Sequence, residues 1–177
     1  MSILDFLKHR ASARPDVHGD TDTVRRIVSE LNKLEPARAR HLAAFAYVLS
    51  RVASADLEIS DVETRKIVEI VQRLGKIPEE QAIIVAEIAN SQNRLFGGTE
   101  NFLVTREFKE IASEEERRQL LDCLFAVSAA DDAITGEEEN QIWQIASELG
   151  FQHSEYIQAR LGYQEKRTVF QKRESKN

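Results

Sequence analysis

The sequence predicts an all-α protein, a single helical domain of about seven to nine helices. Three observations support this class. Ala, Leu, Ile, Glu, Arg and Gln are abundant, whereas the chain has only 7 Gly, 3 Pro and few runs of β-branched residues. Apolar residues recur at helical spacing along most of the chain. One stretch also repeats after 75 positions, which indicates two related helix hairpins.

The chain has 177 residues, of which 42% are hydrophobic, and this leaves room for one ordinary domain. We expect a short N-terminal helix and linker at 1–19, a helical domain at 20–162 and a basic, disordered tail at 163–177. The linker is poor in large apolar residues and contains Pro15 and Gly19.

Hydrophobic periodicity, together with helix-capping and helix-breaking residues, predicts the helices in order. They are expected at about 20–34, 36–55, 60–74, 76–89, 100–111, 113–129, 135–149 and 153–161. Pro36 fits the first turn of its helix. Gly75 and Gly150 close theirs, because glycine most readily takes the left-handed conformation that ends a helix. Residues 91–98 are predicted as a loop, since they contain two consecutive glycines.

The repeat aligns residues 49–75 with residues 124–150 without a gap, and ten of the 27 columns are identical. Helical amphipathicity explains the shared apolar columns but not the shared Asp, Glu and Gly. Each copy reads as an apolar helix, an acidic turn and a second helix capped at both ends. We expect the two hairpins to pack as pseudo-symmetric halves around one core.

Part of each acidic turn is explained by helix capping. Ser60 with Glu63, and Thr135 with Glu138, have the spacing of a capping box, in which each side chain bonds the backbone amide of the other residue. These four residues therefore need no function beyond starting a helix. Ser113 with Glu116 has the same spacing and is predicted to start the helix at 113–129 in the same way.

Asp56 and Asp131 need a different explanation. They lie at or just beyond the C-terminal end of the preceding helix, where the helix dipole disfavours a carboxylate. The compensating positive group is the N-terminus of the following helix, a Lys or Arg, or a bound cation. Oxygen ligands select hard ions, so the candidate is Ca²⁺ or Mg²⁺. The candidate ligands are Asp56, Glu58, Glu63, Asp131, Asp132 and Glu138.

Neither turn is an EF-hand, because the span from Asp to Glu is only eight residues and the acidic groups do not alternate as that loop requires. Two interpretations stay open: purely structural turns, or a cation site.

The sequence does not predict an enzyme. No group of residues resembles a nucleophile with its base, and Gly97 and Gly98 lack the following Lys and Ser/Thr of a P-loop. Cys123 lies in an apolar stretch and is expected to be a core thiol, and Trp143 is expected in the core. The four histidines are scattered at His9, His18, His41 and His153.

The net charge of −6 argues against nucleic-acid binding, which relies on a cationic surface. The single cysteine fits a reducing compartment, so we expect a cytoplasmic protein. Nothing approaches the ~20 apolar residues of a membrane span. The N-terminal helix is expected to dock on the domain or lie beside it; peripheral membrane association is the alternative, which Asp5 disfavours by interrupting the apolar face.

The two acidic segments, S-A-D-L-E-I-S-D-V-E at 54–63 and A-A-D-D-A-I-T-G-E-E at 129–138, resemble the TerB-like family, named for a tellurite-resistance protein. The resemblance covers about residues 20 to 162. It implies two related helical halves whose acidic turns lie near each other as a metal-binding or interaction surface. It also implies a non-enzymatic role in bacterial stress response, often within membrane-associated or chaperone-like assemblies. Leu57 and Asp132 depart from the pattern, which usually has Gly after the Asp.

The leading hypothesis is thus a cytosolic TerB-type binding module whose acidic turns bind a divalent cation, a protein partner, or both. The alternative is a purely structural interaction domain in which every acid is a helix cap or part of a solvated face.

Overall fold

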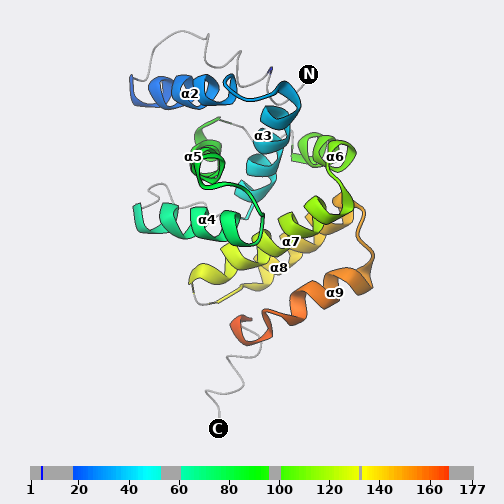
Figure 1. Ribbon diagram of the computed structural model, residues 1–177. Helices are drawn as coiled ribbons and strands as arrows, with labels where there is room; N and C mark the ends of the chain where they lie inside the picture. The colour runs from blue at the N-terminus through cyan, green and yellow to red at the C-terminus, as the bar shows by residue number, and fades with distance from the viewer. Residues whose placement is uncertain (1–4, 6–17, 53–60, 96–100, 132, 168–177) are drawn as a thin grey trace.

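The computed structural model describes residues 5, 18–52, 61–95, 101–131 and 133–167, and within these it leaves the side chains of 18–24, 61, 91–95 and 131 undescribed. The described chain is all-α, as predicted (Figure 1). Its eight α-helices are α2 (His18–Leu31), α3 (Pro36–Ser50), α4 (Asp61–Arg73), α5 (Glu79–Leu95), α6 (Asn101–Ile111), α7 (Glu114–Ser128), α8 (Gly136–Leu149) and α9 (His153–Leu161). Two 3₁₀ turns, η1 (Ala129–Asp131) and η2 (Gln164–Lys166), follow α7 and α9.

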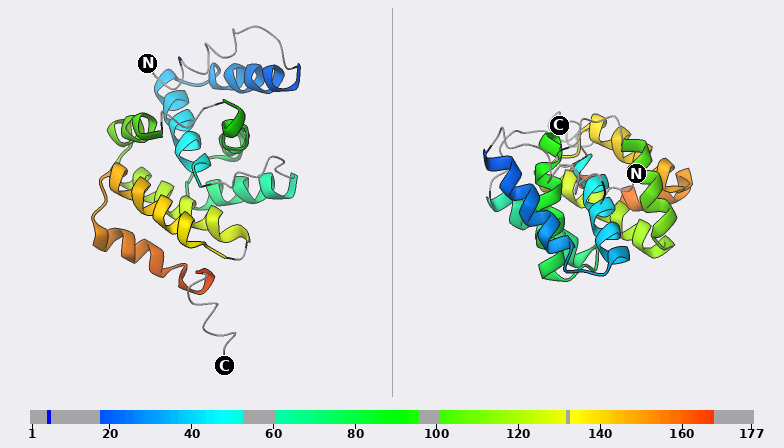
Figure 2. Two further views of the ribbon diagram at one scale, coloured as in Figure 1. Left: turned by 180° about the vertical axis from the view of Figure 1, so that it is seen from behind. Right: turned by 90° about the horizontal axis from the view of Figure 1, so that it is seen from above.

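Helix α3 is the centre of the fold. Every residue from 41 to 50 is buried, so this helix has no solvent face over that stretch. It packs against α5 and α6, while α4 packs against α5 and α7. Helices α7 and α8 run side by side, and α9 covers them (Figures 1 and 2). The first hairpin therefore meets the second mainly through α4 and α7.

One continuous apolar core joins these helices. Its largest fully buried side chains include Phe45 and Tyr47 from α3, Phe108 from α6 and Phe125 from α7. Phe45 and Phe108 meet edge to face with ring centroids 5.9 Å apart. The pseudo-symmetry of the two halves stays a prediction, although α4 and α8 both start at the position that the repeat assigns to them.

Several predicted helix boundaries were wrong. Helix α2 ends at Leu31 instead of at residue 34, and α5 begins at Glu79 instead of at residue 76. Helix α2 begins at His18 instead of at residue 20, and α3 ends at Ser50 instead of near residue 55. Helix α5 continues to Leu95, into the predicted loop at 91–98. Residues 91–95 contain neither Gly nor Pro, and Gln, Arg and Leu favour helix, so nothing in them stops α5.

The two closing glycines differ in their backbone. Gly150 has a φ of 92°, and its amide and that of Phe151 bond the carbonyls of Ser147 and Ala146, which closes α8 as predicted. Gly75 does not take a positive φ; Lys76 does instead, at 53°. The expectation of a left-handed Gly75 was therefore wrong.

Close packing explains the glycine at position 75. A Cβ there would lie 2.6 Å from the Val71 carbonyl oxygen and 3.3 Å from the Phe45 ring, which is closer than a side chain tolerates. Gly75 is thus required by the approach of neighbouring atoms.

Most of the predicted N-terminal part at 1–19, the first acidic turn at 53–60 and residues 168–177 lie outside the described residues. None of the described helices is both long enough and apolar enough to cross a bilayer.

Candidate functional site

The predicted metal ligands are only partly described. Three of them lie outside the described residues: Asp56, Glu58 and Asp132. Asp131 is the last residue of η1, directly after α7, as expected from the sequence. Glu63 is exposed in the first turn of α4, and Glu138 lies in the first turn of α8. Within the described part of the chain, no three His, Cys, Asp or Glu residues are grouped to hold a metal ion. The cation site stays a prediction.

Glu138 caps α8 as the sequence predicts. Its backbone N–H donates to Thr135 Oγ1 at 3.2 Å, and its Oε2 accepts from the Thr135 N–H and hydroxyl, both at 2.8 Å. The same arrangement joins Ser113 and Glu116 at the start of α7, so both predicted boxes that the structure describes are present. Such a cap stabilises its helix by about 1 kcal/mol.

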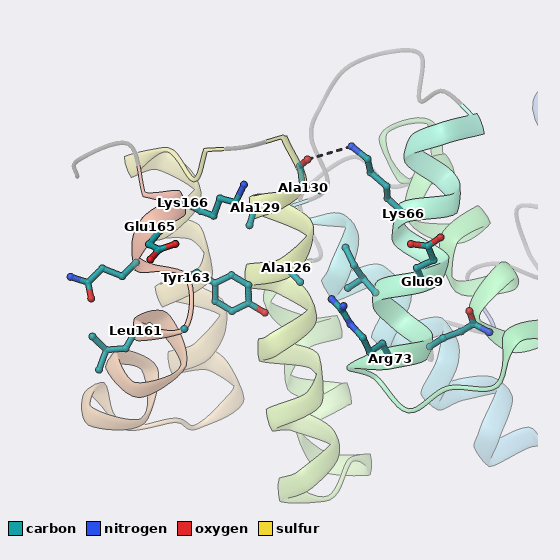
Figure 3. A pocket seen from close by; sticks show the side chains of 14 residues that line it. Lys66, Glu69, Arg73, Ala126, Ala129, Ala130, Leu161, Tyr163, Glu165 and Lys166 are labelled. Carbon is teal, nitrogen blue, oxygen red and sulfur yellow. Dashed lines mark hydrogen bonds between the residues drawn. The ribbon is translucent and has the colours of Figure 1, made fainter. Parts of the chain in front are cut away.

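A lysine of the first hairpin reaches the end of η1. Lys66 Nζ of α4 donates to the carbonyl oxygen of Ala130, the residue before Asp131, at 3.4 Å (Figure 3). The ammonium group offsets the negative end of the α7 dipole. A Lys is one of the compensating groups that the sequence led us to expect, and it comes from the opposite hairpin. The beginning of α4 therefore lies beside the second acidic turn.

The segment that follows α9 binds to the other side of this turn. We call residues 162–167 the strap. The Ile134 N–H, in the second acidic turn, donates to the Lys166 carbonyl at 2.7 Å, and Ile134 and Arg167 form an isolated parallel β-bridge. The Arg167 guanidinium binds the Glu139 carboxylate through two nitrogens, with Nη2 2.8 Å from Oε2. That hydrogen-bonded carboxylate raises the pKa of Arg167.

Tyr163 anchors the beginning of the strap. Its ring stacks on Phe125 of α7, with centroids 5.4 Å apart and planes 14° apart, and its hydroxyl donates to the Asp122 carbonyl at 3.2 Å. Burial, together with nearby Asp122, raises the pKa of Tyr163 to about 12. The packed chain therefore continues at least to Arg167, beyond the predicted domain end at 162. The sequence pointed to a basic tail here because its local composition is polar.

An open groove of about 1650 Å³ lies between α4 on one side and residues 161–166 on the other (Figure 3). Alanines 126, 129 and 130, from α7 and η1, lie between the two walls. Helix α4 contributes the charged side chains of Lys66, Glu69 and Arg73. Glu165 and Lys166 face the groove from the strap. The Lys66 to Ala130 contact places one end of the groove at the second acidic turn.

The groove has a mixed lining. It consists of charged side chains, amides, apolar residues from alanine to leucine and isoleucine, and one phenol. Cys123, the only cysteine, is fully buried, and burial raises its pKa to about 12, so the thiol is a core group as predicted.

The family model for tellurite resistance protein TerB matches residues 41–161. The chain belongs to the TerB family. A search of curated proteins and a search of solved structures gave no match.

The TerB match confirms the resemblance predicted from the two acidic segments. It runs from His41 in α3 to Leu161 at the end of α9, so both hairpins and both acidic turns lie inside it. The α4, α7 and η1 sides of the groove belong to the TerB region, whereas the strap begins one residue after it. The chain is thus an all-helical, tellurite-resistance-associated module with an added C-terminal strap.

Proposed function

We propose that this chain is a non-enzymatic, cytoplasmic binding module for bacterial tellurite resistance and stress response, and that a protein partner docks in the groove beside the second acidic turn. The groove itself is the observation that supports this proposal most. It is open, it offers charges of both signs, and its small alanines allow close approach of another chain.

Arg73 is the residue with which to test the groove. It is exposed in the last turn of α4 and lines the groove, and it pairs with no acidic side chain in the described chain. Arg65, on the same helix, is equally exposed but does not line the groove. The helix dipole disfavours a carboxylate in the last turn, so Arg73→Glu is expected to destabilise α4 more than Arg65→Glu. The comparison is therefore made well below the Tm of both variants, where both are folded and differ mainly in their position relative to the groove.

The experiment compares affinity capture from the native host by wild type, Arg73→Glu and Arg65→Glu, with the captured proteins identified by mass spectrometry. We expect one or more proteins to be enriched with wild type and Arg65→Glu and lost with Arg73→Glu. The same enriched set with all three chains would reject the groove as the docking place.

A divalent cation at the acidic turns is the second candidate function, with Ca²⁺ or Mg²⁺ held by some or all of Asp56, Glu58, Glu63, Asp131, Asp132 and Glu138. Two observations favour it. Asp131 follows the C-terminal end of α7, and the single positive charge of the Lys66 ammonium group beside this turn offsets only part of the negative charge of Asp131, Asp132 and Glu138. Both bonds that Glu138 accepts fall on Oε2, which leaves Oε1 without a partner among the described residues.

Thermal unfolding tests this cation. A ligand that binds only the folded state at 100 times its Kd adds about 2.7 kcal/mol of stability. We expect millimolar Ca²⁺ or Mg²⁺ to raise the Tm of the wild type and to leave the Asp56→Asn, Asp131→Asn double variant unchanged. An unchanged Tm in the wild type would favour the alternative, a structural interaction domain without a metal.

A further inference from the structure

We infer that the second acidic turn and the adjacent face of α7 form a recognition site for a short segment in which an aromatic residue, a 3₁₀ turn and an arginine follow one another, with the arginine four positions after the aromatic residue. The chain's own residues 163–167 occupy this site. The site adjoins the groove, in which the strap forms the wall opposite α4. It rests on the proposed function, because it specifies one segment of the protein partner, which takes the place of the strap while the partner docks against α4 and α7. Three contacts of different kinds define it: a backbone bridge at Ile134, a carboxylate at Glu139 and an aromatic surface at Phe125.

The backbone contact holds the end of the 3₁₀ turn η2 against the second acidic turn. The Ile134 side chain is 1% exposed, which fixes the direction of its backbone N–H, and this group binds the Lys166 carbonyl at 2.7 Å. This bond is made to the backbone and so does not depend on the side chain at that position. Arg167, the next residue, has the extended backbone (φ −81°, ψ 126°) that continues the bridge.

The carboxylate contact selects arginine. The Glu139 and Arg167 side chains are only 12% and 13% exposed, and the guanidinium engages both carboxylate oxygens. A lysine ammonium cannot reproduce this two-pronged geometry. The Tyr156 hydroxyl donates to the Glu139 carbonyl at 3.1 Å and so helps to hold this residue in place.

The aromatic contact fixes the spacing. Phe125 receives the Tyr163 ring face to face, and the Asp122 carbonyl receives its hydroxyl. Tyr163 lies four residues before Arg167, so a competing segment must place an aromatic ring and an arginine at the same separation. Stacking of this kind is stabilising beyond the area that it buries.

The residues that contact the strap lie inside the TerB match, whereas the strap lies outside it. Phe125, Ile134 and Glu139 lie inside the TerB match at 41–161, and Tyr163 and Arg167 lie outside it. The receiving surface therefore belongs to the TerB region, while its occupant is an extension of the chain. A tethered occupant has a local concentration in the millimolar range. An external segment of the same chemistry should bind well only after the strap is released.

The test uses the full-length protein and a fluorescent synthetic peptide with the sequence of residues 162–170. In an Arg167→Glu chain, Glu139 repels the strap and the site is free. We expect this chain to bind the peptide at least tenfold more tightly than wild type, and the uncharged Arg167→Gln chain to change in the same direction. The matched control is Arg173→Glu, which reverses another tail charge and should behave like wild type.

Peptide variants test the recognition chemistry. Replacing the peptide's Arg167 by Glu, or its Tyr163 by Ala, should weaken binding to the Arg167→Glu chain at least tenfold. Equal affinity of the wild-type and Arg167→Glu chains, no binding to the Arg167→Glu chain, or indifference to the peptide's Arg would each overturn the site. The groove test substitutes Arg73 or Arg65, and the cation test substitutes Asp56 and Asp131. Neither test changes Glu139 or the strap, so a failure of the recognition site can be told apart from a failure of the proposed function.

Discussion

Arg51 and Glu148 form a buried ion pair between the two hairpins. Arg51, directly after α3, places Nη1 2.5 Å from Glu148 Oε2 in α8, and the two side chains are only 3% and 9% exposed. The same nitrogen donates to Thr105 Oγ1 of α6 at 2.7 Å. One guanidinium thus joins three helices, and Arg51 lies two residues before the first acidic turn in the sequence.

Glu148→Gln should destabilise the protein strongly, because it leaves the Arg51 charge buried without a carboxylate. We expect the free energy of unfolding to fall by about 3 kcal/mol. The matched control is Glu110→Gln, whose partner Arg106 forms an ion pair on the exposed surface of α6; there we expect a loss below about 1 kcal/mol. Urea unfolding measures both, and equal losses would contradict a special role of the buried pair.

Gly75 and Gly150 should respond differently to the same substitutions. At Gly150 the obstacle is the positive φ, so Ala costs about 1 kcal/mol and Asn, which tolerates this conformation, costs less. At Gly75 the obstacle is the nearby Val71 carbonyl, so Ala costs about 2 kcal/mol and the larger Asn costs more. Urea unfolding measures the loss of stability in each variant. We expect Ala to be the more costly substitution at Gly150 and Asn the more costly one at Gly75; the same order at both sites would refute these mechanisms.

His41 should make the protein less stable in mild acid. Burial lowers its pKa below the ordinary 6.5; Glu116 opposes this shift and Arg38 adds to it. The unfolded chain therefore takes up the proton at a higher pH than the folded chain. The free energy of unfolding should fall as the pH drops through 6.5 towards the pKa of His41 in the folded state. Each pKa unit between the unfolded-state and folded-state values lowers that free energy by about 1.4 kcal/mol.

His41→Phe should remove this dependence, because phenylalanine fits among the neighbouring aromatic rings without titrating. Unfolding midpoints between about pH 7 and pH 5.5 measure the effect. His153→Gln, a change on the exposed surface of α9, should retain the wild-type slope. If the His41→Phe chain has the same pH dependence of the unfolding midpoint as the wild type, groups other than His41 cause that dependence.

Cys123 should be inert while the protein is folded. Its sulfur is fully buried, 3.9 Å from the Ile70 carbonyl oxygen, and burial raises its pKa to about 12. Alkylation by iodoacetamide should be roughly three orders of magnitude slower in the native protein than in urea, because it requires unfolding and a thiolate. Similar rates in both conditions would show that the thiol is accessible and would reopen a reactive role.

The sequence predicts the features that depend on neighbouring residues. The caps at Ser113 and Thr135 join residues three positions apart, and a local pattern was enough to find them. The strap could not be found this way, because Arg167 and Glu139 are 28 residues apart and nothing periodic connects them. Gly75 shows a further limit. Its place in the repeat predicts that it takes the same left-handed conformation as Gly150, but the conformation of Gly75 is set by tertiary packing and differs.

The two acidic turns are proposed to converge on one divalent cation, and Mn²⁺ tests this in solution because it broadens the NMR signals of nearby amides. At substoichiometric Mn²⁺ we expect amides of residues 53–60 and 130–138 to broaden first and together, and excess Mg²⁺ to restore them. The acidic start of α7, with Glu114, Glu115 and Glu116, is the internal control and should respond only at higher Mn²⁺. Equal broadening at the two turns and at this control would contradict the proposed site.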